Sequence, residues 1–237
     1  SRSMRLARTA LFALVLIATP AFAAGPTTAV ATEVTRTALL LGILAVLPAM
    51  VISTTSFLRI IVVLAMVRHA FGMPQTPPNA VLTSLALFMS AFLMQPTLEQ
   101  VNREALQPFL DGKAGIEQSM DRATAPLRTF MLAHTRERDI EMVYTVARTP
   151  LPENAESISL LRLIPAFMLN ELRVAFTIGF VILLPFLLID LVVSSVLLSL
   201  GMMMVPPATI SLPIKVLMFV LIDGWSLVMQ GLLGSFG

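Results

Sequence analysis

The chain contains no cysteine, one tryptophan, one tyrosine and two histidines among 237 residues. The absence of cysteine excludes disulfide bonds and thiolate metal sites. Charged residues make up only 13% of the chain, whereas a soluble domain has roughly 25%. With 57% hydrophobic residues, the composition excludes a protein that exposes its whole surface to water and indicates one unit of a membrane or membrane complex.

The sequence also lacks the short motifs of common catalytic sites. It has no HExxH, no GxSxG and no phosphate-binding GxxxxGK[ST] pattern. The only histidines, His69 and His134, are predicted on opposite sides of the membrane, and the acids of the apolar segments lack the GxGD context of intramembrane aspartyl proteases. We therefore expect no enzymatic activity, no cofactor and no metal.

Residues 1–23 have the organisation of a cleaved secretory signal peptide. Arg2, Arg5 and Arg8 form a basic region, residues 10–18 form a short apolar core, and Ala21-Phe22-Ala23 is an A-x-A cleavage box. The alternative is an uncleaved first membrane helix, but the apolar core has about half of the ~20 residues that a span needs. Without this segment, 13 basic residues stand against 14 acidic ones, so no basic patch indicates a nucleic-acid partner.

After the signal peptide, apolar segments alternate with one polar insert. The apolar segments span residues 38–67, 80–94, 164–200 and 212–233. We predict an all-α fold in which residues 24–95 and residues 163–237 each form an apolar helical hairpin. Residues 96–162 are predicted to form a small helical insert between the hairpins.

Two of the apolar segments are longer than one membrane span. Residues 38–67 contain Pro48 and the polar run 53–56, and residues 164–200 contain Pro185. We expect bent or broken helices there, because proline removes a backbone hydrogen bond. Irregular backbone at membrane depth is tolerated only inside protein or beside a water-filled cavity. The pattern therefore predicts a larger helical assembly around this chain.

The insert is predicted to contain a helix that Thr124 caps and Pro126 begins. Its buried face would consist of Leu127, Phe130, Met131 and His134. The prolines at 150 and 152 would end it. The charges of residues 135–142 are interpreted as a solvated helix face.

Cleavage of the signal peptide would set the topology. The chain would enter the membrane at 38–67, turn inside at 68–79 and leave at 80–94, which places the insert in the periplasm. The first inside turn carries Arg68 and no acid, as the positive-inside tendency favours. The second inside turn, residues 201–211, is uncharged and gives no information.

The two hairpins resemble each other in sequence. A shift of 129 residues aligns nine identical residues within the 22 positions 57–78. Both turns then read G-M-x-x-x-P-P, with Gly72, Pro77 and Pro78 in the first and Gly201, Pro206 and Pro207 in the second. Coincidence between Leu- and Val-rich helices would explain the aliphatic matches but not the aligned turn residues. The pattern favours two related hairpins in parallel orientation.

Ionisable residues interrupt the apolar segments at six positions. These are Arg59, Glu171, Arg173, Asp190, Lys215 and Asp223. Each would cost roughly 2.5–3.5 kcal/mol if it faced hydrocarbon, so mutual pairing inside protein is expected. One interpretation is an ion or proton path and the other is a set of contacts between helices; the balanced signs and the absence of histidine favour the second.

Asp190 and Lys215 are the best candidates for a pair. They lie about 10 and 8 residues from the edges of the turn at 201–207, so at ~1.5 Å per residue their depths differ by only about 3 Å. Glu171 and Arg173 are two residues apart and point to different faces of one helix. Each of these two is expected to pair with another segment or another chain.

Two long stretches carry a family resemblance. They are TSFLRIIVVLAMVRHAFGMPQTPPNAVL at 55–82 and FLLIDLVVSSVLLSLGMMMVPPATISLPIKVLMFVLIDGWSLV at 186–228. Both closely resemble the FliP family of flagellar type III export-gate proteins, and the resemblance covers essentially the whole chain after residue 23. It implies a subunit of the flagellar basal body in the bacterial inner membrane, through which unfolded flagellar proteins leave the cytoplasm. It also implies a homo-oligomer, a pentamer in the family architecture, that assembles with FliQ and FliR into a helical cone and meets FlhB, FlhA and membrane lipids.

The resemblance gives the methionine-rich turn a role. It implies that Met202, Met203 and Met204 form a ring that closes the pore. Methionine is flexible and can repack around varied shapes, and a hydrophobic constriction can block ions by dewetting. The alternative is that these methionines fill a core beneath neighbouring helices. The six charges and Phe130 are expected at hairpin or subunit contacts.

Two rival functions come from the residues alone. A self-contained small-solute transporter built on two parallel repeats would have a binding site near the midplane of one chain. A structural membrane scaffold would show no conductance whatever is changed in the methionine turn.

Overall fold

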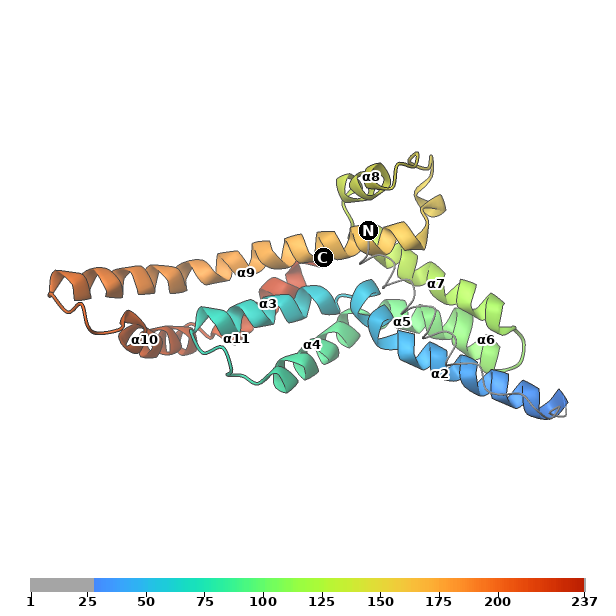
Figure 1. The fold of residues 1–237 in the computed structure, drawn as a ribbon, viewed down its shortest axis with the longest axis horizontal. Helices are drawn as coiled ribbons and strands as arrows, with labels where there is room; N and C mark the ends of the chain where they lie inside the picture. Colours follow the sequence, from blue (N-terminus) through green and yellow to red (C-terminus); the bar gives the residue numbers. More distant parts are fainter. Residues whose placement is uncertain (1–27, 237) are drawn as a thin grey trace, which may run out of the picture. The chain divides into compact units, whose positions relative to one another are not determined.

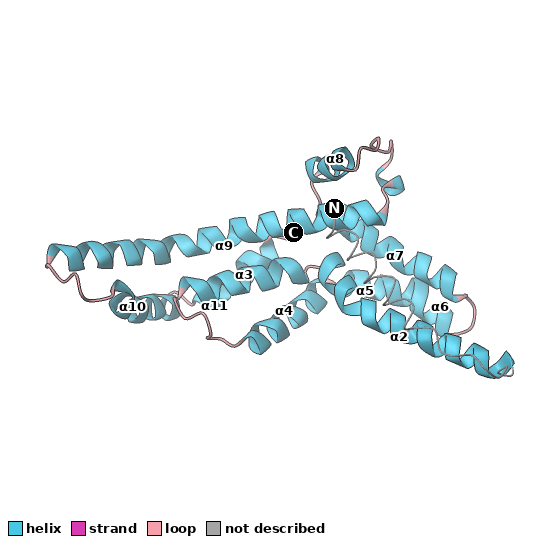
Figure 2. Ribbon diagram, viewed as in Figure 1, coloured by secondary structure: helices cyan, strands magenta, loops and turns pink. Residues whose placement is uncertain are grey.

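The computed structural model describes residues 28–236, and all regular structure among them is helical (Figure 1, Figure 2). The prediction of an all-α fold is therefore confirmed for these residues. The predicted signal peptide, residues 1–23, lies outside the described residues. The chain divides after Leu47 into two compact units, and each is described by itself.

The first unit contributes the N-terminal part of helix α2 (Thr28–Thr54) to the described residues. The second unit, Pro48–Gly237, holds the end of α2 and the helices that follow it. These are α3 (Phe57–Ala70), α4 (Asn79–Leu93), α5 (Gln95–Val101), the π-helical turn η1 (Asn102–Leu106), α6 (Gln107–Leu110), α7 (Ile116–Ala133), α8 (Glu137–Val146), the 3-10 turn η2 (Ala155–Ser157), α9 (Leu160–Ser199), α10 (Pro207–Leu221) and α11 (Gly224–Gly234).

Helix α9 runs for 40 residues without a break and contains Pro165 and Pro185. The expectation that the helix could break at Pro185 is therefore not met. Each proline removes one hydrogen bond, and the packing of α3 along α9 (Figure 1) holds the remaining turns together. Gly179 on α9 allows the close approach of α3, because an added Cβ at this position would lie only 2.3 Å from Met66 Sδ.

The polar run at 53–56 does interrupt the first long segment, between α2 and α3. Ser53 and Thr54 donate their hydroxyl groups back to backbone carbonyls four residues earlier, at 2.7 Å in both cases. Ser56 is fully buried and its Oγ lies 3.0 Å from Ser90 Oγ on α4. These side-chain bonds compete with regular helix geometry and fix the junction against α4.

The main core lies where α3 packs against α9, α4 and the C-terminal helices. Ile60, Val63, Leu64 and Val67 follow the i, i+3, i+4, i+7 spacing of one helix face, and all four are fully buried. Burying each such side chain contributes about 1.5–3 kcal/mol relative to leaving it exposed. This face of α3 is therefore the main attachment of the first hairpin to the second.

The internal repeat has a structural counterpart. The bounds of α3, shifted by 129 residues, become Phe186–Ser199, which is the C-terminal end of α9. The same shift carries the start of α5 at Gln95 onto the start of α11 at Gly224. Both hairpins also bend before these helices, by 67° and 66°. The apolar segment 212–233 is thus not one helix, because it breaks at Asp223.

The prediction for the insert helix was wrong about its limits. Helix α7 begins at Ile116, with Pro126 in its interior, and ends at Ala133, so α8 is a separate helix. Thr124 does not cap a helix; its Oγ1 donates to the carbonyl of Asp121 at 2.8 Å. Helix α7 packs against α5 and η1, and this tertiary packing stabilises a helix that begins upstream of the proline.

Among the described residues, α9 alone is long and apolar enough to cross a membrane as a single helix. Up to four spans result if each bent pair of helices is counted as one.

Candidate functional site

The methionine-rich turn begins where α9 ends. Gly201 has φ +73°, its N–H donates to the carbonyl of Leu198 at 3.0 Å, and the N–H of Met202 donates to Leu197 at 2.9 Å. These two bonds define a Schellman motif, which satisfies the last carbonyls of the helix. Glycine is favoured at this position because it adopts positive φ without a steric penalty.

The chain then returns through α10. Pro206 has an extended conformation before the helix and Pro207 is its first residue, a position where the missing N–H of proline removes no helical bond. Figure 1 shows the turn at the end of the hairpin, where α9 passes into α10.

The three methionines of this turn are all exposed. Their exposed fractions rise along the turn, from 43% at Met202 through 79% at Met203 to 95% at Met204. In the first hairpin, the equivalent Met73 is partly buried and packs against the main core. The thioethers at 202–204 thus form an apolar tip that the described part of the chain leaves exposed.

The first turn is closed by polar contacts instead. Gly72 also has positive φ, +78°, and its N–H donates to the carbonyl of His69 at 3.0 Å. Arg68 donates to Asn79 Oδ1 at 2.5 Å and to the carbonyl of Pro77 at 3.2 Å. Pro78 precedes α4 in an extended conformation.

One ion pair ties together the two arms that carry the methionine turn. Lys215 Nζ on α10 lies 2.6 Å from Asp190 Oδ2 on α9. The lysine side chain is nearly buried, whereas the aspartate side chain is 40% exposed. The contact sets the register of the hairpin from a point well behind the turn.

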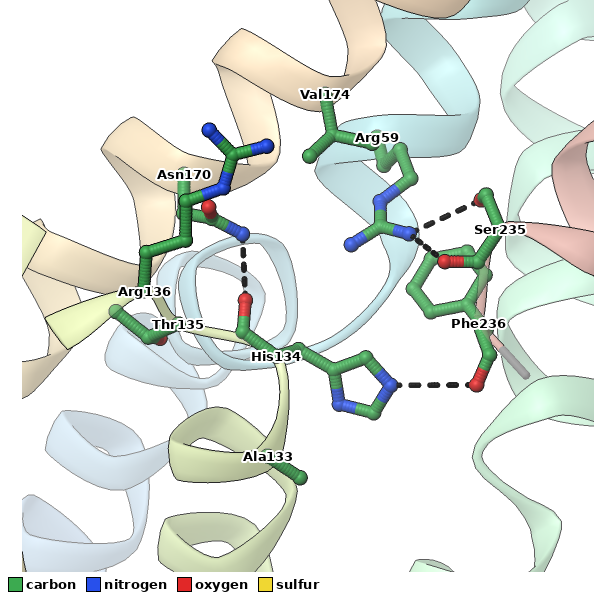
Figure 3. A pocket seen from close by; sticks show the side chains of 9 residues that line it. All are labelled: Arg59, Ala133, His134, Thr135, Arg136, Asn170, Val174, Ser235 and Phe236. Atoms are coloured by element: carbon green, nitrogen blue, oxygen red, sulfur yellow. Dashed lines mark hydrogen bonds between the residues drawn. The ribbon is translucent and has the colours of Figure 1, made fainter.

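A second ion pair joins α3 to α9. Arg59 binds Glu171 with two bonds, Nε to Oε2 at 2.8 Å and Nη2 to Oε1 at 2.5 Å, and the exposed fractions are only 2% and 0%. The third nitrogen, Nη1, donates to the carbonyl and hydroxyl oxygens of Ser235 at 2.7 and 3.0 Å. The guanidinium also lies 3.7 Å from the centre of the Phe236 ring (Figure 3), so every side of this buried charge has a partner.

A cavity of about 480 Å³ opens beside this cluster (Figure 3). On its far side, Asn170 donates to the carbonyl of His134 at 2.5 Å. His134 Nε2 lies 3.5 Å from the carbonyl oxygen of Phe236. The insert, α3, α9 and the C-terminal residues therefore meet at one place.

A third ion pair joins the insert to α9. Arg173 Nη1 and Nη2 each lie 2.7 Å from one carboxylate oxygen of Asp139 on α8. Asp139 is fully buried, so the interpretation of the charges of residues 135–142 as a solvated helix face was wrong for this residue. The spacing of Asp139 with Ile140, Val143 and Tyr144, which lie in or against the insert core, is the signal that identifies it.

The remaining site residues, Asp223 and Phe130, are placed differently. Asp223 is exposed, has φ +49° and forms no ion pair with any described residue. Phe130 is half-buried and packs within its own chain, with ring centres 4.4 Å from His134 and 5.9 Å from Phe167.

Within the part of the chain that the structure describes, no group of three or more His, Asp or Glu side chains is arranged to hold a metal ion. The fold and the site together define a class: a helical, membrane-associated protein with two hairpins of similar sequence, tied by ion pairs and tipped by an exposed thioether turn.

Comparison with known proteins identifies the particular family. The FliP family model matches residues 40–232. The flagellar biosynthetic protein FliP of Bacillus subtilis is 46% identical over 198 residues, which cover 84% of this chain and 90% of that protein. The proteins of the same description from Pectobacterium carotovorum and Aquifex aeolicus are 48% and 43% identical, over 85% of this chain in each case and over 78% and 85% of their own lengths. The chain belongs to the FliP family.

Proposed function

We propose that this chain is a pore-forming subunit of the flagellar protein export gate and that Met202, Met203 and Met204 form its seal. The observation that carries the proposal is the exposure of all three thioethers at the tip of a hairpin that an ion pair holds in register. Membership of the FliP family supports the same role, because the relatives are named flagellar biosynthetic proteins.

The chemistry of the turn suits a gate for unfolded polypeptides. Such a gate must exclude ions when idle and accept many side-chain shapes when open. Thioether side chains are flexible and polarizable, and a narrow apolar ring resists wetting without any charged group. Several copies around one axis would bring the exposed tips of neighbouring hairpins together.

The proposed assembly is a homo-oligomer, a pentamer, with FliQ and FliR in the bacterial inner membrane. FlhB and FlhA would be further neighbours, and unfolded flagellar subunits the cargo. The insert would lie in the periplasm, with residues 1–23 removed. Exposed leucines on α9, including Leu188 and Leu191, provide apolar surface for neighbouring chains. The three ion pairs would keep the hairpins and the insert in register during assembly.

Ion leakage through the closed complex tests the seal. The complex carrying Met202→Ala, Met203→Ala and Met204→Ala is reconstituted into liposomes, and the rate of potassium efflux is measured. The triple variant is expected to leak, because alanine leaves the ring wider and easier to wet. The matched control is Met142→Ala, an exposed methionine on α8, which should stay tight. Equal tightness of the triple variant and the control would refute the seal.

The parallel repeats leave a self-contained solute transporter as the rival function. That function predicts an active single chain, whereas the gate predicts activity only in a complex of several copies with other chains. Native mass spectrometry combined with the efflux assay separates the two. A structural scaffold would show no efflux with any of the variants.

A further inference from the structure

Among the six ionisable residues that interrupt the apolar segments, one has no partner among the residues that the structure describes. Arg59 pairs with Glu171 and Lys215 pairs with Asp190, while Arg173 is taken by Asp139 of the insert. The acid left over is Asp223, at the junction of α10 and α11.

The bend at this junction does not require an acid. The equivalent position in the first hairpin is Met94, where α4 passes into α5 with a bend of 67°, against 66° at Asp223. Met94 is almost completely buried and has ordinary right-handed φ and ψ, −83° and −1°. The same bend is therefore made with an apolar residue and without positive φ.

Asp223 is not used as a helix cap either. It precedes α11 in the position where aspartate commonly accepts a bond from the first turn, but its side chain makes no such bond. Its left-handed conformation, with φ +49°, would be adopted more readily by glycine. Neither the bend nor the cap explains the carboxylate.

The residues next to Asp223 in the sequence are apolar, and the described part of the chain leaves them exposed. Val220, Leu221, Ile222 and Leu227 are each about half exposed or more. Lipid would cover the leucines well but would leave an unpaired carboxylate at an unfavourable cost in free energy. A protein surface that is apolar around one positive charge would cover the apolar side chains and also pair with the carboxylate.

We infer that Asp223 and this apolar surface bind an apolar helix of a different polypeptide that carries a single lysine or arginine. The inference deepens the proposed function and rests on it, because it names the kind of chain that joins the gate subunit. On the described residues, a second copy of this chain is a poor partner, since Arg59, Arg173 and Lys215 already have acids and the Arg162 guanidinium lies 4.8 Å from the centre of the Tyr144 ring. Arg68 lies near the first turn. With the two hairpins parallel, the depths of Arg68 and Asp223 along the hairpin axis differ by about 20 Å, at ~1.5 Å per residue.

Three substitutions at position 223 separate the effect of the carboxylate charge from the effect of the backbone conformation. Asp223→Asn keeps the size and tolerates positive φ but removes the charge, Asp223→Glu keeps the charge, and Asp223→Lys reverses it. The matched control is Glu141→Lys, which reverses an exposed acid on α8. Each variant is produced as the full chain together with the other membrane chains of the export complex, and native mass spectrometry counts the chains of each type.

The expected result is that the complex loses one type of partner chain and keeps the others. Asp223→Lys should lower the amount of one other chain type by about 30-fold or more, as truncation of a buried charge pair does. Copies of this chain should stay together. Asp223→Asn should give a smaller loss, while Asp223→Glu and Glu141→Lys should retain the partner. Replacing one lysine or arginine in an apolar helix of that partner by glutamate should restore binding to Asp223→Lys.

Full retention of every chain type in Asp223→Lys would overturn the inference, and so would loss of contact between copies of this chain in Asp223→Asn. The leakage assay is independent of these counts. A tight triple-alanine variant would refute the seal while leaving the Asp223 contact measurable, and an unaffected Asp223→Lys complex would refute the contact while leaving the seal measurable.

Discussion

The buried pair of Arg59 and Glu171 gives the sharpest stability prediction. Glu171→Leu leaves the guanidinium, 2% exposed, without its two carboxylate bonds, and an uncompensated buried charge costs about 3–5 kcal/mol. Arg59→Leu leaves the carboxylate unpaired and also removes both bonds to Ser235, which adds about 1–3 kcal/mol. The double variant removes both charges and should lose only the stability contributed by the two hydrogen bonds to Ser235, since replacing a buried pair by apolar residues is often neutral.

The assay is unfolding of the purified protein in detergent, followed by the fluorescence of the single tryptophan. Trp225 packs edge-on against Phe219 with ring centres 5.3 Å apart, so its emission reports the second hairpin. We expect a coupling free energy of at least about 3 kcal/mol in the double-mutant cycle. The control pair is Asp111 and Lys113, which are largely exposed and should couple by no more than about 1 kcal/mol. Additive single substitutions at Arg59 and Glu171, or losses below about 1 kcal/mol, would refute the reasoning.

Three further predictions follow from the same geometry. Asp190→Lys and Lys215→Asp should each lower the yield of assembled complex by about tenfold, or ~1.4 kcal/mol, and the exchanged double variant should restore it on size-exclusion chromatography; a double variant no better than either single one would contradict the pairing. Asp139→Asn should destabilise the protein by about 1–3 kcal/mol, because Arg173 loses its charged partner, and an unchanged melting temperature would show that the contact contributes nothing. Gly201→Ala should destabilise it by about 1–2 kcal/mol through positive φ alone, since no atom lies near the added Cβ, and a stabilised variant would contradict the Schellman geometry.

The sequence predicts best those features that depend on local chemistry. Asp190 and Lys215 are 25 residues apart on the two arms of one hairpin, so distance from the turn was enough to place them at similar depth. Gly201 and Pro207 end and begin helices for reasons that apply to any chain. The all-helical fold followed from long apolar segments.

Features that depend on packing between distant segments could not be predicted in the same way. Glu171 was expected to pair with another segment or another chain, but the sequence did not identify Arg59, 112 residues away, because no spacing rule joins the two. The contact of Arg59 with the backbone carbonyl of Ser235 has no side-chain signature at all. The start of α7 upstream of Pro126 depends on packing against α5 and η1, which outweighed the usual preference of proline for a helix start.

The most direct test of the central claim is disulfide cross-linking at the methionine turn. The chain has no cysteine, so Met202→Cys, Met203→Cys and Met204→Cys each introduce a single thiol per copy. Cross-linking requires Cα atoms within about 4.4–6.8 Å of each other, which only neighbouring tips around a common narrow axis would provide. Mild oxidation of the assembled complex should give covalent dimers of this chain from at least one of the three positions, whereas Met142→Cys on the insert serves as the reference for random collision. If all three turn positions give no more dimer than Met142→Cys, the methionines do not meet, and the account of the gate is wrong.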